Sequence, residues 1–131
     1  MKKIILIILL LIELLIINIP PYVELNNLAI IEEIGVIKEH NQYTLILKEV
    51  IPIKDNQGIK YQYKYYQESS TTLINAYENL KEDTKKKLYL KKAKSLITNI
   101  SSSKEILKIL NIKPGNIIHT KDNIFKKIKS N

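Results

Sequence analysis

The stretch "IKYQYKYYQ" at residues 59–67 has the clearest periodicity in this chain. Isoleucine and three tyrosines occupy alternate positions, and the positions between them are mostly polar and basic. Alternation with a period of two is typical of a β-strand with one face packed on a core and the other in solvent. We therefore predict a strand with an aromatic face and a polar face.

The aromatic face, formed by Tyr61, Tyr63 and Tyr65, has two interpretations. Tyrosines interleaved with lysines can stack nucleic-acid bases and contact phosphates. The period, however, places the tyrosines on one face and the lysines on the other, so an aromatic stripe packed in the core is the simpler account. We expect no nucleic-acid partner, and we predict a candidate surface patch on the other face, formed by Lys60, Lys64 and Tyr66.

Outward from this strand, the apolar pattern predicts an α+β fold. Residues 26–40 and 42–53 carry apolar residues at alternate positions on both faces, which indicates two further strands. Residues 69–87 change to a helical period, residues 87–100 return to strand character, and residues 102–115 predict a second helix. We expect a mixed or antiparallel sheet of about four strands with two helices, in the order β-β-β-α-β-α, after an N-terminal hydrophobic helix.

Length and composition bound the organisation. The chain has 131 residues, a formal net charge of +8 and no cysteine, and every basic residue is lysine. A phosphate-reading surface usually recruits arginine, and a chain without cysteine has neither disulfides nor thiolate metal ligands. We expect a signal anchor or transmembrane helix at residues 1–21, one α+β domain at residues 22–115 and a basic tail at residues 116–131.

The N-terminal segment "MKKIILIILLLIELLIIN" has two lysines followed by fourteen residues that are apolar except for Glu13. A charged start before an apolar stretch describes a secretory signal, but Pro20 and Pro21 stand where small residues would be needed for cleavage. An uncleaved anchor is the alternative that we prefer. Its thirteen isoleucines and leucines contribute roughly −4 to −8 kcal/mol to insertion, which outweighs about +3 kcal/mol for one acid.

Three residues of this segment bear on membrane topology. Lys2 and Lys3 would hold the N-terminus in the cytoplasm by the positive-inside rule, so that the domain from about residue 22 onward faces outward. Glu13 is either a tolerated substitution or an intramembrane carboxylate that pairs with a partner helix, and we favour the first interpretation.

A search for chemistry yields no catalytic, cofactor-binding or metal-binding residue. His40 and His119 have no second histidine or cysteine at ligand spacing. Glu32 and Glu33 are adjacent on a predicted strand and would point to opposite faces, so they cannot form a paired acid and base. We predict that the chain is not an enzyme and needs no cofactor.

The segments "ELNNLAIIEEIGV", "YTLILKEVIP", "LINAYENL" and "KKLYLKKAKSLI" together resemble the N-terminal domain of the C subunit of spore germinant receptors, the GerAC-type germination lipoproteins. The family places a lipidated cysteine shortly before the Glu-Leu pair, where this chain has Pro20 and Pro21. The resemblance covers roughly residues 22–100. Its matching positions are Glu24, Leu25, Leu28, Ala29, Gly35, Tyr43, Pro52, Ala76, Leu80, Leu88 and Tyr89.

The resemblance implies a membrane-tethered, extracytoplasmic and non-enzymatic module that acts in spore germination through protein–protein contacts. Its implied partners are the membrane and other membrane-protein subunits of a receptor. Its implied location is the bacterial cell membrane, and in spores the inner membrane. The residues alone leave an alternative open, a basic secreted or tethered module that binds an anionic polymer or a lipid surface through Lys60, Lys64 and the lysines of the tail.

Overall fold

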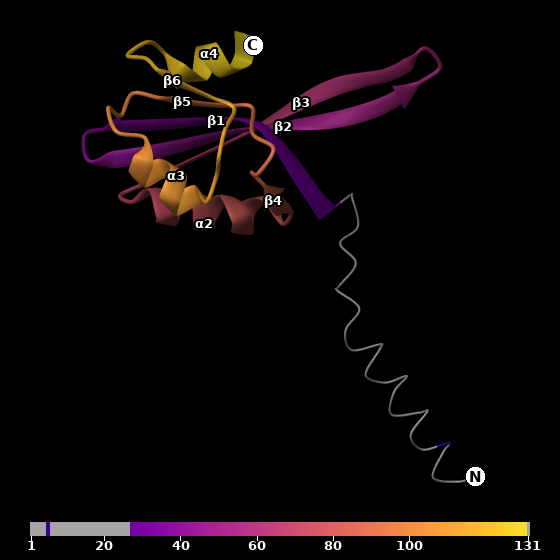
Figure 1. Ribbon diagram of the computed structural model, residues 1–131, viewed down its shortest axis with the longest axis horizontal. Helices are drawn as coiled ribbons and strands as arrows, with labels where there is room; N and C mark the ends of the chain where they lie inside the picture. The colour runs from indigo at the N-terminus through magenta and orange to yellow at the C-terminus, as the bar shows by residue number, and fades with distance from the viewer. Residues whose placement is uncertain (1–4, 6–26, 131) are drawn as a thin grey trace.

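The structure is a computed structural model that describes Ile5 and residues 27–130. The part of the chain from residue 27 onward forms six strands and three helices around one mixed sheet (Figure 1). In chain order the elements are β1 (Leu28–Glu39), β2 (Gln42–Asp55), β3 (Gly58–Ser70), α2 (Leu73–Thr84), β4 (Lys87–Tyr89), β5 (Ser95–Thr98), α3 (Lys104–Leu110), β6 (Asn116–His119) and α4 (Ile124–Ser130).

The sheet combines an antiparallel meander with parallel strands from later in the chain. Its strand order is β3-β2-β1-β5-β6, and β4 also pairs with β1. β1, β2 and β3 are joined by tight turns and run antiparallel, whereas β4 and β5 are parallel to β1 and β6 is parallel to β5. Tight turns favour antiparallel neighbours, and parallel neighbours need the longer crossovers that α2 and α3 provide.

The predicted architecture of about four strands and two helices, in the order β-β-β-α-β-α, is wrong in its count and its order. Residues 87–100, expected as one strand, form β4 and β5 with a turn between them. β1 has an irregular register between Ile31 and Glu33, and the two short strands pair with β1 on either side of this bulge. At the bulge the Glu32 carbonyl accepts a hydrogen bond from the Lys94 amide at 2.7 Å, which closes the gap between them.

The residues expected as a basic tail form part of the same fold. Asn116–His119 is β6, and Ile124–Ser130 is α4. Four-residue strands and seven-residue helices carry too little periodicity to stand out in a sequence, and their pairing partners define them.

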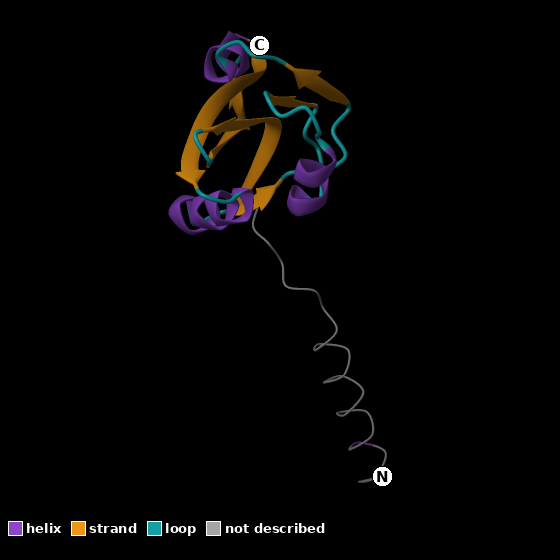
Figure 2. Ribbon diagram, turned by 90° about the vertical axis from the view of Figure 1, so that its left-hand side faces the viewer, coloured by secondary structure: helices purple, strands orange, loops and turns teal. Residues whose placement is uncertain are grey.

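Helices cover both faces of the sheet, which gives three layers (Figure 2). α2 and α3 lie on one face, and their apolar residues pack on the large core. α2 begins with a hydroxyl cap, because Thr72 Oγ1 accepts a hydrogen bond from the Asn75 amide at 3.2 Å. The main buried members of this core are Ala29, Ile31, Ile34, Val36, Leu45, Leu47, Leu73, Ala76, Leu80, Leu96, Ile106 and Leu110.

On the opposite face of the sheet, α4 packs over a second, smaller core. Ile124 and Ile128 pack against Ile46 of β2 and Ile97 of β5. Between these strands β1 contributes Gly35, and a Cβ at that position would lie 2.5 Å from Ile128 Cδ1. A side chain there would hold the helix away from the sheet, so the absence of one at residue 35 lets α4 approach closely.

No helix in the described residues is long and apolar enough to cross a membrane. A transmembrane helix was expected, and the described residues contain none; the segment predicted to form it, residues 1–21, lies outside them apart from Ile5.

The close packing of α4 on Gly35 leads to a prediction about stability. Gly35→Ala places its Cβ against Ile128, and we expect it to lower the free energy of unfolding by about 1–3 kcal/mol through overpacking. Chemical denaturation of the full chain measures the loss. Ile128→Val removes the clashing Cδ1, so the double variant should regain much of the stability that Gly35→Ala loses. An unchanged midpoint for Gly35→Ala alone would contradict the seating of α4.

Candidate functional site

The most exposed apolar surface of the domain lies on a two-stranded arm. β1 pairs with β2 no further than Glu49, and beyond that point β2 pairs with β3 alone. Residues 50–63 therefore project from the three-layered body as a hairpin, which we call the arm (Figure 1). At its tip Asp55 Oδ1 accepts a hydrogen bond from the Gln57 amide at 2.7 Å, and Gly58 takes a φ of +130° that a glycine tolerates.

The register of β2 on β3 assigns the side chains of the arm to two faces. Residues directly opposite in an antiparallel pair lie on the same face of a sheet. Val50 is opposite Tyr63, Pro52 is opposite Tyr61, and Lys54 is opposite Ile59. One face therefore carries an uninterrupted apolar group, which we call the tyrosine face: Val50, Pro52, Ile59, Tyr61 and Tyr63.

The tyrosine face is largely open to solvent. Ile59 is 66% exposed, Tyr61 is 60% exposed and Tyr63 is 45% exposed. Pro52 is also exposed, and Val50 is half-buried. Single exposed apolar residues are ordinary, but neighbouring large ones on one face mark an interaction surface.

The prediction that the three tyrosines share one face is confirmed by the register, but their assignment to the core is wrong. Tyr65 alone is half-buried, because its ring meets Phe125 of α4 edge-on with centroids 6.5 Å apart. Tyr61 and Tyr63 belong to the arm, which extends past α4 in Figure 1, and they stay exposed. Strand periodicity reports which residues share a face, whereas only the tertiary structure decides where the covering helix ends.

A buried ion pair anchors the base of the tyrosine face. Lys48 of β2 is 2% exposed, and its ammonium lies 3.4 Å from Glu33 Oε2 and 4.5 Å from the centre of the Tyr63 ring. A buried charge needs a close partner, and the ring face adds a second favourable contact. Lys48 was not among the predicted site residues, although a lysine inside the apolar stretch "YTLILKEVI" is a signal in the sequence that marks it.

The predicted patch of Lys60, Lys64 and Tyr66 lies on the other face of β3. The Lys60 ammonium pairs with Asp55, and Lys64 lies over the Tyr66 ring at 5.0 Å. The Tyr66 hydroxyl donates to Glu49 Oε2, and Lys86 binds the other oxygen of that buried carboxylate at 2.9 Å. Burial, with Glu49 next in effect, raises the pKa of Tyr66 well above its usual range.

These contacts give the members of the patch different roles. Tyr66 is half-buried and ties β3 to Glu49 and through it to Lys86, so it is a structural residue of the body. Lys60 and Lys64 are exposed on the arm and each is engaged by a group of its own strand pair.

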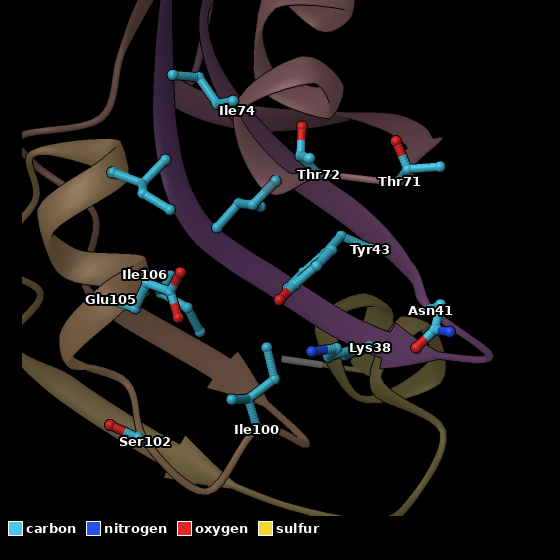
Figure 3. A pocket seen from close by; sticks show the side chains of 12 residues that line it. Lys38, Asn41, Tyr43, Thr71, Thr72, Ile74, Ile100, Ser102, Glu105 and Ile106 are labelled. Atoms are coloured by element: carbon cyan, nitrogen blue, oxygen red, sulfur yellow. The ribbon is translucent and has the colours of Figure 1, made fainter.

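A separate groove of about 470 Å³ lies between the N-terminal ends of α2 and α3 (Figure 3). Apolar side chains line it together with hydroxyls, and Lys38 and Glu105 bring opposite charges to it. Lys38 also lies over the Tyr43 ring at 4.9 Å. The twelve lining residues include no histidine or cysteine: Lys38, Asn41, Tyr43, Thr71, Thr72, Leu73, Ile74, Ile100, Ser102, Glu105, Ile106 and Ile109.

The remaining predicted residues contribute no further cluster. His119 Nδ1 lies 2.9 Å from the Ile100 carbonyl, and His40 occupies the β1–β2 turn with a positive φ. Within residues 27–130, no three histidine or carboxylate groups are placed to share a metal ion. The topology residues Lys2, Lys3 and Glu13 lie outside the described residues.

Comparisons with protein-family models, with curated proteins and with solved structures found no match to this chain. The resemblance to germinant-receptor C subunits therefore stays a prediction from sequence. The site is defined by its own geometry, an exposed aromatic face on an arm that is anchored by a buried ion pair.

The buried pair at the base of the arm is testable. Glu33→Gln leaves the Lys48 ammonium buried without its counter-charge, and we expect it to reduce the free energy of unfolding by about 3–5 kcal/mol. The double variant Glu33→Leu/Lys48→Met removes both charges at similar volume and should be close to the parent chain. Urea denaturation of the full chain compares the three proteins. A Glu33→Gln variant as stable as the parent would show that Lys48 does not depend on this carboxylate.

Proposed function

We propose that this chain is a non-enzymatic module that acts in spore germination through protein–protein contacts, in the manner of the N-terminal domain of a germinant-receptor C subunit. The observation that carries the proposal is the exposed tyrosine face. Tyr61 and Tyr63 present rigid aromatic rings at a surface, and such rings are enriched among the residues that dominate binding at protein interfaces.

The arm itself supports a role in contact. A two-stranded hairpin on its own is at best marginally stable in water, and it needs packing on one face. Here the arm is a continuation of β2 and β3, which the body holds through the Lys48–Glu33 pair and through Tyr66. The body thus holds an apolar surface in a fixed position before any partner arrives, which reduces the entropy cost of binding.

Five of the positions that carry the family resemblance have structural roles, and two others, Glu24 and Leu25, lie outside the described residues. Ala29 of β1 and Ala76 of α2 are fully buried, and Leu80 and Leu88 belong to the same core. Gly35 is the seat of α4. The resemblance therefore concerns residues that determine packing, as expected if this chain and the family share a fold, and it supports the functional proposal only through that fold.

The proposed location is the outer side of the bacterial cell membrane, and in spores the inner membrane. It follows from the resemblance, and the proposed partners there are the membrane-embedded subunits of a germination receptor. No helix that crosses the bilayer is part of this proposal.

The alternative is a basic module that binds an anionic polymer or a lipid surface through Lys60, Lys64 and the lysines of the tail, and it has less support. Asp55 neutralises Lys60, one of the two lysines that this alternative places on the arm. Arginine, the residue most suited to planar recognition of phosphate, is absent from the whole sequence.

Two measurements in the source organism test the proposal. Deleting the gene should slow or abolish the response of spores to germinants, measured as the loss of refractility with time. Photo-crosslinking should then identify the neighbour: p-benzoylphenylalanine in place of Tyr61 should capture a membrane-embedded receptor subunit. The same group in place of Ile74, an apolar residue of α2 that is 52% exposed, is the matched control and should not. Spores that germinate normally without the gene would overturn the proposed function.

A further inference from the structure

The sheet face that bears the tyrosine face is already covered by a helix over part of its length. α4 lies on Gly35, Ile46 and Ile97, and its Phe125 meets Tyr65 edge-on. Tyr63 and Tyr61 follow Tyr65 along β3 on the same face. Along β3 the tyrosines therefore form a row from beneath α4 onto the arm, and the buried Lys48 of β2 lies beside this row, opposite Tyr65. α4 covers only one end of the row (Figure 1).

The way in which α4 binds this surface indicates what else fits there. Ile124 and Ile128, one turn apart, are buried on the sheet, and Phe125 beside them packs on a tyrosine. This is the pattern of an amphipathic helix that lays one apolar stripe on a sheet. The uncovered part of the face offers two more tyrosine rings, with Val50 and Ile59 as neighbours, to a helix of the same kind.

The border of the tyrosine face is basic. Lys54 is opposite Ile59 at the tip of the arm. Lys129, in the last turn of α4, lies 5.7 Å from the centre of the Tyr65 ring, at the junction between the covered and uncovered parts. Lys94, whose side chain is 75% exposed, pairs with Glu32 beside the bulge of β1, so it adds no net charge to this border. The nearby acids Glu32 and Glu33 are each engaged by a lysine of the domain.

We propose that the tyrosine face binds an acidic amphipathic helix of a partner protein, which continues the layer that α4 begins. The apolar stripe of this helix covers Tyr61 and Tyr63, and its flanking carboxylates face Lys54 and Lys129. The inference deepens the proposed function, on which it rests for the existence of a protein partner, by naming the chemistry of that partner.

Two other occupants fit less well. An extended segment added to the edge of β3 would satisfy backbone groups but leave the tyrosine rings as exposed as before, because side chains project from the faces of a sheet and not from its edge. A second copy of this chain, packed face to face, would bring the lysines at the border of one arm against those of the other.

A binding measurement with two designed probes tests the proposal. Each probe is a fluorescent 18-residue helix with the apolar stripe of α4, isoleucine, phenylalanine and isoleucine at positions i, i+1 and i+4, repeated once. One probe has glutamate at all flanking positions and the other has lysine. Titration with the full chain, followed by fluorescence anisotropy, should give at least ten-fold tighter binding of the glutamate probe, and added salt should narrow this difference.

Variants of the full chain locate the binding. Tyr61→Ser/Tyr63→Ser should weaken binding of the glutamate probe at least ten-fold. Ile74→Ser removes an exposed apolar side chain from α2, on the other side of the sheet, and should leave binding of the glutamate probe unchanged. Equal binding of the two probes, equal loss in both variants, or no binding of either probe at millimolar concentration would each overturn the proposal. So would binding of anionic vesicles, or self-association in sedimentation, that is lost in the double tyrosine variant while neither probe binds.

The outcomes separate this inference from the proposed function. If spores need the gene but the glutamate probe does not bind, the partner chemistry is wrong and the function stands. If the probe binds at the tyrosine face but spores germinate normally without the gene, the surface is a helix-binding site and its assignment to germination is wrong.

Discussion

The pairing of Lys48 with Glu33 lies at the point on which the rest of this structure depends. There β1 bulges, β4 gives way to β5 as its parallel neighbour, and β2 loses β1 as its partner. A lysine that is almost wholly buried needs a close counter-charge, so the ion pair with Glu33 as well as packing fixes the register of β2 on β1. The arm begins one residue beyond Glu49, where the register of β2 on β1 is fixed.

The helical layers divide the sheet unequally. α2 and α3 cover the face with the larger core, while the seven residues of α4 cover only part of the other. Because Gly35 has no side chain, this short helix packs closely on the sheet. The contact of its Phe125 with Tyr65 marks the point beyond which α4 no longer covers the sheet. The exposed tyrosines are thus the consequence of a short helix on a long sheet, and the same arrangement suggests what completes the layer.

Local patterns in the sequence predicted the first half of this fold and, in the second half, the helix α3. The alternation at residues 59–67 gave the correct strand and the correct shared face of Tyr61, Tyr63 and Tyr65, and the change of period gave α2. β4, β5 and β6 have three or four residues each and exist because they pair with β1 or with one another. The ion pair at the base of the arm joins residues fifteen positions apart, so it can be recognised only once the register of β1 on β2 is known.

The parallel half of the sheet also sets the order in which this domain assembles. The β1–β2–β3 meander contains only nearby contacts, whereas Glu33 pairs with Ser95 and Gly35 receives Ile128. Such distant pairings are slow to form because a long loop must close first. Ile46 and Ile97 therefore stay uncovered until α4 packs on them, and apolar surface exposed in this way favours aggregation.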